Sequence, residues 1–198
     1  MHSPLPKIYL ARHGETIWSL SGQHTGMTDI PLTDHGKADA LHLGKRLHGL
    51  TFAKVFSSPL QRALKTCELA GFDSMVIPDP LLEEWNYGDY EGLTTTQIQQ
   101  TQPDWFVFRD GCPGGELPKQ VAQRCDQMIE KMKAINGDIL IFAHAHILRM
   151  HTTRWLGLPA EEGRLYFLST ASLSILGYEH NLSEPVIRLW NDTSHLAT

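Results

Sequence analysis

An arginine and a histidine stand side by side directly after an apolar run near the start of the chain. Residues 8–11 are Ile-Tyr-Leu-Ala, Arg12 and His13 follow, and Gly14 comes next. This pattern predicts a buried strand that ends at a tight turn. In open α/β sheets, ligands bind at the carboxyl ends of the strands. A planar cation beside an imidazole at such a position indicates a site where an anion is held and attacked by the histidine.

A second histidine and a second arginine follow two other expected strands. The apolar run 138–143 predicts a central parallel strand that ends at His144. The run 54–57 predicts a short strand, and the sequence after it predicts a helix that is capped by Ser58 and carries Arg62 in or next to its first turn. If these strands are parallel neighbours, two arginines, two histidines and a helix N-terminus surround one point. Such a pocket suits a dianionic phosphoryl group.

The remaining patterns predict the elements that position these residues. Thr33 predicts the N-cap of a helix that runs to about Leu47, and residues 121–135 have the spacing of an amphipathic helix. Residues 94–118 predict an insert, a short helix and then a turn-rich loop, and loops of this length often act as lids. Strands are also predicted at 75–77, 165–168, 172–178 and 186–189, and a helix at 147–156. We expect a single α/β domain over residues 1–198, with three layers: a mainly parallel sheet and helices on both faces.

Composition and charge exclude several classes of protein. The net charge of −5 argues against a general nucleic-acid binder. No apolar run is long enough to cross a bilayer, and residues 1–6 lack the pattern of a secretion signal. Three scattered cysteines are too few for a disulfide framework or a four-thiolate zinc site. We therefore expect a cytoplasmic protein with reduced thiols that binds neither nucleic acid nor membrane.

Motifs along most of the chain resemble those of the histidine phosphatase superfamily, which includes cofactor-dependent phosphoglycerate mutases. Residues 12–16, Arg-His-Gly-Glu-Thr, are similar to its R-H-G signature, and residues 32–36 to its L-T-x-x-G helix start. Residues 57–63 resemble its S-S-P-x-x-R-A segment, and residues 84–92 resemble E-x-x-x-G-x-x-E-G. The strand that ends at His144 is similar to the strand that carries the family's second histidine. The resemblance implies a phosphoglycerate mutase-like fold.

The resemblance also implies a role for each of five side chains. His13 is expected to be the nucleophile that accepts the phosphoryl group, and Arg12, Arg62 and His144 to hold the phosphoryl oxygens. Glu84 is expected to protonate the leaving alkoxide and then to take a proton from the water that hydrolyses phosphohistidine. Because these groups supply the positive charge, the resemblance implies neither a metal nor another cofactor. The implied reaction is hydrolysis of a small phosphorylated metabolite.

The chain departs from the common family pattern at two positions, and further segments resemble one branch of the family. Ser19 stands where many members have asparagine, and Ala145 where they have glycine after the second histidine. Segments 18–26, 84–92 and 110–112 look most like the sugar-bisphosphate phosphatases typified by fungal sedoheptulose-1,7-bisphosphatase. This likeness implies a sugar phosphate or bisphosphate as substrate. It also implies substrate contacts from Ser19, Thr25, Gly26, Ser58, Trp85, Tyr87, Ala145 and Arg149.

Rival interpretations exist for several of these residues. His144 and His146 are two apart and could share a face as a metal pair, but no further ligand motif accompanies them. We therefore favour phosphate contact for His144 and a structural or helix-start role for His146. Arg109 and Arg149 fit a second-phosphate contact and a surface salt bridge equally well. The other histidines are expected at the surface: His24, His35, His42, His48, His151, His180 and His195.

Rival functions also stay open. A phosphoglycerate mutase uses the same chemistry, but known mutases have a longer insert with paired arginines, whereas the insert here has only Arg109. An inactive module that binds phosphorylated ligands is an alternative of another class, although its hallmark would be the loss of His13 or Glu84. Dimerisation is common in the family, so a homodimer is a further expectation that the sequence leaves open.

Overall fold

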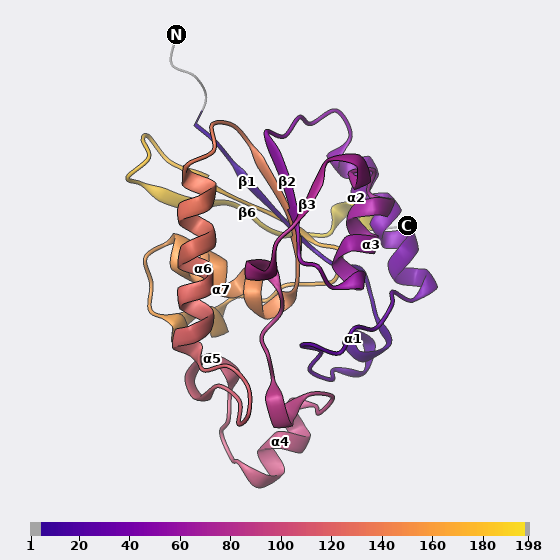
Figure 1. Ribbon diagram of the computed structural model, residues 1–198, viewed down its shortest axis with the longest axis vertical. Coiled ribbons are helices and arrows are strands. Elements are labelled where there is room, and N and C mark those ends of the chain that lie inside the picture. Colours follow the sequence, from indigo (N-terminus) through magenta and orange to yellow (C-terminus); the bar gives the residue numbers. More distant parts are fainter. Residues whose placement is uncertain (1–4, 197–198) are drawn as a thin grey trace.

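A six-stranded sheet forms the centre of the computed structural model, which describes residues 5–196 (Figure 1). Its strand order is β3-β2-β4-β1-β5-β6. The first four strands in this order are parallel, β5 is antiparallel to β1, and β6 is antiparallel to β5. The expected mainly parallel α/β sheet is thus confirmed. The strands are β1 (Ile8–Arg12), β2 (Lys54–Ser57), β3 (Val76–Pro78), β4 (Ile139–Ala143), β5 (Leu173–Tyr178) and β6 (Pro185–Asp192).

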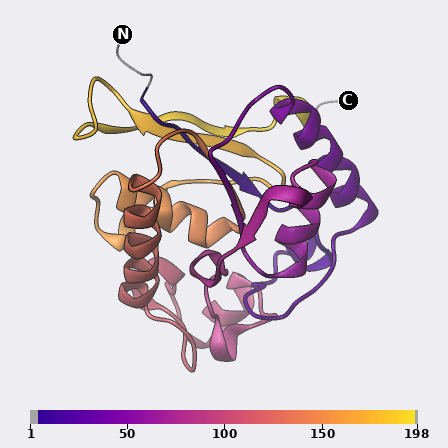
Figure 2. The same cartoon turned by 45° about the horizontal axis from the view of Figure 1, so that its top comes forward.

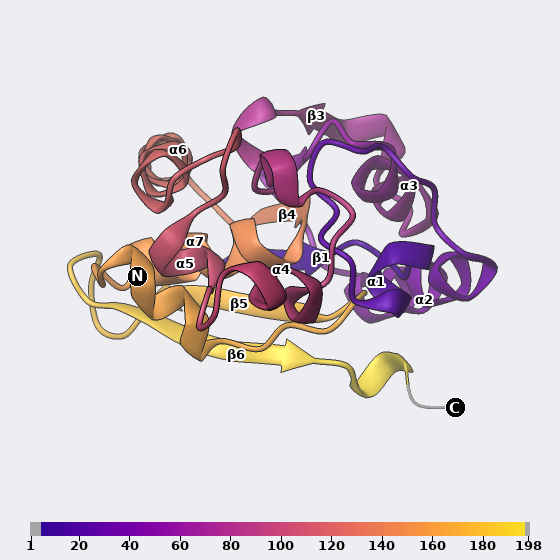
Figure 3. The same ribbon diagram turned by 90° about the horizontal axis from the view of Figure 1, so that it is seen from below.

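Helices cover both faces of the sheet, as Figures 2 and 3 show. Helices α2 (Asp34–Leu47) and α3 (Gln61–Leu69) lie on one side, and α6 (Pro118–Lys133) and α7 (Ala145–Trp155) on the other. Strand β4 is apolar throughout because all five of its residues are buried. Leu140 and Phe142 pack in the cluster with α2 and α3, whereas Ile139, Ile141 and Ala143 pack in the cluster with α6 and α7. A strand that is covered on both faces can have no polar alternation.

Two helix starts show where local sequence signals succeeded and failed. Thr33 caps α2 as predicted, because its hydroxyl accepts from the Gly36 N–H at 3.0 Å. The predicted cap at Ser58 is wrong, since α3 begins at Gln61 and Leu60 occupies its N-cap without a side-chain bond. The Ser58 hydroxyl is instead bonded to a ring nitrogen of His144. It also accepts from the Leu60 N–H at 3.3 Å, so Ser58 forms a local turn and a tertiary bond but does not cap the helix.

The expected strand at 165–168 is also wrong. Leu165 ends a 3-10 helix, Ala160–Leu165, and residues 166–168 have no strand partner in the described chain. Their carbonyls bond to side chains instead, because the Leu168 carbonyl accepts from Arg12 and the Phe167 carbonyl from Trp190. An apolar run alone does not show whether its backbone is paired.

The insert at 94–118 contains two short helices, α4 (Thr95–Thr101) and α5 (Val107–Asp110), rather than the single one expected. It contributes to the core, because Trp105 and Phe108 are buried. The Trp105 indole N–H donates to the Gly111 carbonyl at 2.9 Å, and Phe108 packs edge-on against Trp85. Figure 1 shows α4 beyond the carboxyl end of the sheet. Movement of the insert as a lid stays a prediction.

The remaining described elements are short. They are α1 (Ile17–Ser21) and the 3-10 helices Asp73–Met75, Pro80–Leu82, Gly88–Tyr90 and Ser194–Leu196. Across residues 5–196, no helix has the length and apolar character that crossing a bilayer requires. The three cysteines, Cys67, Cys112 and Cys125, are free thiols, and each is buried.

Candidate active site

A polar cavity of about 240 Å³ opens at the carboxyl ends of β1 and β4. Helices α1 and α4 lie beyond this edge of the sheet (Figure 1). Parallel pairing of β1 with β4 and of β2 with β4 brings the three strand ends together, as the sequence predicted. The cavity is lined by Arg12, His13, Ser19, Gly22, Gln23, His24, Thr25, Glu84, Tyr87, Thr95, Ala145 and His146.

His13 presents one free ring nitrogen to this cavity. Its Nδ1 lies 2.7 Å from the carbonyl oxygen of Gly14, which can only accept, so Nδ1 carries the ring proton. The Nε2 lone pair is then available for attack. Burial, reinforced by the charges of Arg12 and Arg62, holds the pKa of His13 well below its ordinary value. The ring is therefore neutral at physiological pH, as a nucleophile must be.

Arg12 is the cation that faces the same cavity. Its Nη1 donates to the Leu168 carbonyl at 2.6 Å, which fixes the guanidinium. Its Nε is buried, with no hydrogen-bond partner in the described residues. Burial lowers the pKa of Arg12 to about 10, so the group stays charged at neutral pH. A buried donor that is charged and unpaired is a binding point for an anion.

Arg62 and His144 form a buried pair next to His13. The Arg62 Nε donates to the His144 Nδ1 at 3.0 Å, so the neutral ring carries its proton on Nε2, which donates to the Ser58 hydroxyl at 2.8 Å. The His144 ring lies 5.1 Å from the His13 ring, centroid to centroid. Burial and the Arg62 charge hold the pKa of His144 well below its ordinary value. Both groups belong to the predicted constellation, although neither lines the cavity itself.

A loop of the cavity wall is fastened to Arg62. The two terminal nitrogens of its guanidinium donate to the carbonyls of Thr25, Gly26 and Thr28 at 2.9–3.1 Å. The Glu91 carboxylate accepts from the backbone N–H groups of Gly26 and Thr28, both at 2.9 Å. Glu91 therefore positions the loop that holds Arg62. Glu91 belongs to the motif at residues 84–92, but no spacing in that motif indicates this function.

Glu84 lies at the N-terminus of α7. Its two carboxylate oxygens accept from the backbone N–H groups of Trp85 and Ile147, at 2.9 and 2.8 Å, and of His146, at 3.0 Å. Backbone donors and the positive end of the helix dipole stabilise an anion at this position. Only 4% of Glu84 is exposed, and it faces the same cavity as His13. The chain thus holds one carboxylate rigidly beside the candidate nucleophile.

The expected substrate contacts divide into two groups. Ser19, Thr25, Tyr87 and Ala145 line the cavity. The Ser19 hydroxyl also bonds backbone groups of Thr16 in a capping box at the start of α1, which orients it. These four positions are compatible with the predicted substrate contacts.

The other expected contacts lie outside the cavity. Ser58 is buried against His144, and the backbone of Gly26 is engaged by Glu91 and Arg62. Trp85 is fully buried and donates its indole N–H to the Glu116 carbonyl, so it packs in the core. Two arginines are also used elsewhere. Arg149 donates to the Gly163 carbonyl and lies over the Phe108 ring, and Arg109 pairs with Asp110 at 2.7 Å.

Some histidines are not where the sequence placed them. His24 was expected at the surface, but it lines the cavity, where burial lowers its pKa to about 4. His24 follows an aperiodic polar loop, which gave no signal for this position. His151 was also expected at the surface and is 1% exposed. It lies four residues after the buried Ile147 on α7, so helical spacing contained that signal.

The structure also bears on the metal alternative. Both ring nitrogens of His144 are engaged by protein groups, and the His146 Nδ1 shares a hydrogen bond with the Tyr87 hydroxyl. Among residues 5–196, no group of three or more His, Cys, Asp or Glu side chains is placed to hold a metal ion. The two histidines therefore do not form the ligand pair that their spacing allowed.

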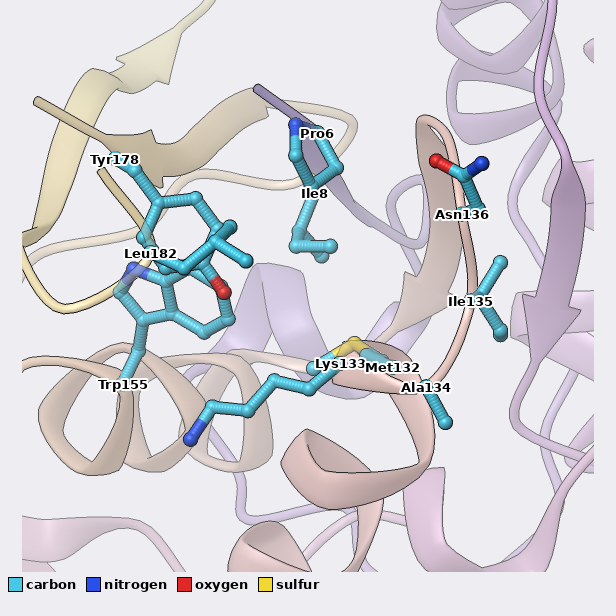
Figure 4. Close-up of a pocket in the computed structure, with 10 residues that line it drawn as sticks. All are labelled: Pro6, Ile8, Met132, Lys133, Ala134, Ile135, Asn136, Trp155, Tyr178 and Leu182. Atoms are coloured by element: carbon cyan, nitrogen blue, oxygen red, sulfur yellow. The ribbon is translucent and has the colours of Figure 1, made fainter. Parts of the chain in front are cut away.

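A second cavity, of about 340 Å³, lies at the opposite edge of the sheet. Figure 4 shows Trp155, Tyr178 and Leu182 together on one side of it. Ile8 and Met132 add apolar surface, and most of the other lining residues are also apolar. It is larger than the polar cavity, and it contains none of the predicted catalytic residues.

Comparison with known proteins identifies the family. The model of the histidine phosphatase superfamily (branch 1) matches residues 8–193. The chain belongs to this superfamily. An acid phosphatase of Mycobacterium tuberculosis is 42% identical over 184 residues, covering 90% of this chain and 89% of its own. The sedoheptulose 1,7-bisphosphatase of Saccharomyces cerevisiae is 33% identical over 194 residues, covering 82% and 72%.

A solved structure supports the same assignment. The structure of the open reading frame Rv3214 product of Mycobacterium tuberculosis superposes on this chain with a TM-score of 0.89 and 40% sequence identity. The match covers 94% of this chain and 97% of the other. Proteins named as probable phosphoglycerate mutases also match this histidine phosphatase.

Proposed function

We propose that this histidine phosphatase hydrolyses small phosphoric monoesters, such as sugar phosphates, through a covalent phosphohistidine at His13. One observation carries the proposal: the neutral His13 ring presents a free Nε2 to the cavity that Arg12 and Glu84 also line. A nucleophile, a cation with an unused donor and a fixed carboxylate are the groups that such a reaction needs. Phosphatase names among the relatives support it.

The first half-reaction transfers the phosphoryl group to the enzyme. His13 Nε2 attacks phosphorus, the P–N bond forms, and the ester P–O bond breaks. Glu84, which takes up a proton as the anionic substrate binds beside it, gives this proton to the leaving alkoxide. Arg12 stabilises the charge on the phosphoryl oxygens. The phosphorylated ring keeps its proton on Nδ1. The Gly14 carbonyl accepts a hydrogen bond from this N–H and so stabilises the positive charge of the ring.

The second half-reaction releases phosphate. Glu84, now a carboxylate, takes a proton from water as the water attacks phosphorus. The P–N bond breaks, and its electron pair returns to Nε2 of His13. Inorganic phosphate forms and leaves, and Glu84 is again protonated for the next turnover. Arg12 supplies the positive charge within the cavity, so the proposed cycle needs no metal.

Phosphate release tests this function. We would assay a panel of sugar phosphates, sugar bisphosphates and phosphoglycerates with EDTA present, using the wild type and His13→Ala. The nucleophile's loss should reduce kcat by roughly 10⁴-fold or more. His48→Ala, which changes an exposed histidine, is the matched control and should keep wild-type activity. Retained activity in His13→Ala would overturn the proposal.

The same panel separates the alternatives. A mutase would interconvert phosphoglycerates when primed with a bisphosphoglycerate, and would release little phosphate. A module that only binds phosphorylated ligands would turn over no member of the panel.

A further inference from the structure

The wall of the cavity opposite the sheet contains a cluster of three rings, His24, Tyr87 and His146. Ring centroids of His24 and Tyr87 lie 4.8 Å apart, and His146 lies 5.8 Å from each of them. Trp105 packs edge-on against His24 from behind, at 5.5 Å. Three separate segments of the chain supply the cluster, so its position depends on the fold around the insert.

The ring cluster carries no charge at neutral pH. Burial lowers the pKa of His24 to about 4 and holds that of His146 well below its ordinary value. Burial also raises the pKa of Tyr87 well above its ordinary value, so its hydroxyl keeps its proton. The cluster offers ring faces and hydrogen-bonding groups, but no countercharge for an anion.

The charged groups of the cavity are few. Of the described residues that line it, Arg12 is the cation and Glu84 the anion, and both lie beside the nucleophile. Arg62 is fully buried, and four of its N–H groups are bonded to the protein. The cationic side of the site is therefore matched to one phosphoryl group.

The arginines expected to bind a second phosphate do not line the cavity. Arg149 donates to the Gly163 carbonyl at 3.0 Å and stacks on Phe108, with its guanidinium carbon 4.6 Å from the ring centre. Arg109 is paired with Asp110 and stacks on Phe106. The Arg149 charge helps to lower the pKa of His146, but this arginine stacks on Phe108 outside the lining. A second phosphate or a carboxylate against the ring cluster would therefore lose water without a direct ion pair, which is costly.

We propose that the substrate carries a single phosphoryl group, and that the rest of it is an uncharged hydroxylated body lying against His24, Tyr87 and His146. This inference rests on the proposed phosphatase function and narrows its substrate class. The hydroxyls of Ser19, Thr25 and Thr95 line the same cavity and suit the hydroxyls of such a body. Bisphosphates and phosphoglycerates place an extra negative charge against the uncharged wall, and are expected to be poor substrates.

Paired substrates test the inference directly. Fructose 6-phosphate is compared with fructose 1,6-bisphosphate, and glycerol 3-phosphate with 3-phosphoglycerate, by kcat/KM at low salt. In each pair, the substrate with the uncharged body should have a kcat/KM about tenfold or more above that of its anionic partner. The reason is that the extra anion loses its water and gains no countercharge. Equal or reversed ratios, with turnover present, would overturn the inference and leave the phosphatase function intact. No turnover of any member would overturn the phosphatase function instead.

A charge introduced at the wall provides the second arm. Thr95 begins α4, lines the cavity and lies 3.3 Å from a ring nitrogen of His24. Thr95→Lys should change the ratio of the two kcat/KM values by about fivefold in favour of the anionic substrate, as expected for a new ion pair near the surface. Gln100→Lys adds the same charge at an exposed position of α4 and should not shift the ratio. An identical shift in both variants would show a general field effect and contradict a specific role for the wall.

Discussion

The two cavities lie at opposite ends of the central strands, and their walls differ in which groups are free to bind a ligand. The apolar cavity is larger, about 340 Å³ against about 240 Å³, and four of its lining residues, Ile8, Met132, Trp155 and Tyr178, belong to one core cluster. Arg12 and His13 line the polar cavity, and within residues 5–196 no group bonds the His13 Nε2 or the buried Arg12 Nε. Cavity size therefore does not locate the chemistry in this molecule. The candidate nucleophile, cation and carboxylate instead share the smaller, polar cavity.

Loss of the acid-base carboxylate should produce the largest contrast between the two regions. In Glu84→Gln, kcat should fall by roughly 10²–10⁴-fold, because an amide can neither give nor take the proton. Steady-state phosphate release measures the loss. Glu83→Gln changes the neighbouring, more exposed carboxylate and should keep nearly full activity. A similar loss in both variants would show that the position of Glu84 over α7 is not what matters.

A truncation in the apolar cavity should affect stability instead of turnover. Met132 is 2% exposed and packs in the core. Met132→Ala should lower the free energy of unfolding by about 2–5 kcal/mol and leave kcat unchanged where the variant is folded. Urea unfolding and phosphate release measure the two effects. Leu182 lines the same cavity at an exposed position. Leu182→Ala should lower the free energy of unfolding by well under about 1 kcal/mol. A large loss of kcat in Met132→Ala would break the separation of the two regions.

The smallest expected effect comes from His151, on the helix that joins the two regions. Its ring is buried, neither nitrogen has a partner in the described residues, and burial lowers its pKa to about 3. The unfolded chain takes up a proton at this residue below about pH 6.5, whereas the folded chain does not. Stability from this group is therefore present above pH 6.5 and falls as pH decreases, by about 2 kcal/mol at pH 5.

A variant isolates this contribution from that of other buried histidines. Between pH 7 and pH 5, His151→Leu should lose about 2 kcal/mol less unfolding free energy than the wild type. His48→Gln, at an exposed position, should lose as much as the wild type. Urea unfolding at the two pH values measures the difference. Equal losses in His151→Leu and the wild type would show that His151 is not held neutral by burial.

Local patterns predicted the parts of the fold that local physics decides. The apolar runs before Arg12 and His144 are strands because both faces of the sheet are covered, and Thr33 caps its helix with its own hydroxyl. The convergence of His13 and His144 followed from the parallel pairing that such runs favour.

Tertiary contacts decided what the sequence did not show. Ser58 bonds to His144, 86 residues away, rather than capping the next helix. Arg149 has the charge to bind a phosphate, but the Gly163 carbonyl and the Phe108 ring hold it elsewhere. His24 lines the cavity, where Tyr87 and Trp105 pack beside it. No spacing rule encodes contacts between segments so far apart in the chain.

Direct detection of the covalent intermediate tests the central claim. The enzyme would be mixed with substrate, quenched in alkali, in which phosphohistidine survives, and digested for mass spectrometry. Glu84→Gln should prolong the signal, because the water that attacks phosphohistidine then lacks its base. We predict one phosphoryl group on the peptide that contains His13, and none there in His13→Ala. Turnover without phosphorylation of His13, or with the phosphoryl group on another side chain, would contradict the account.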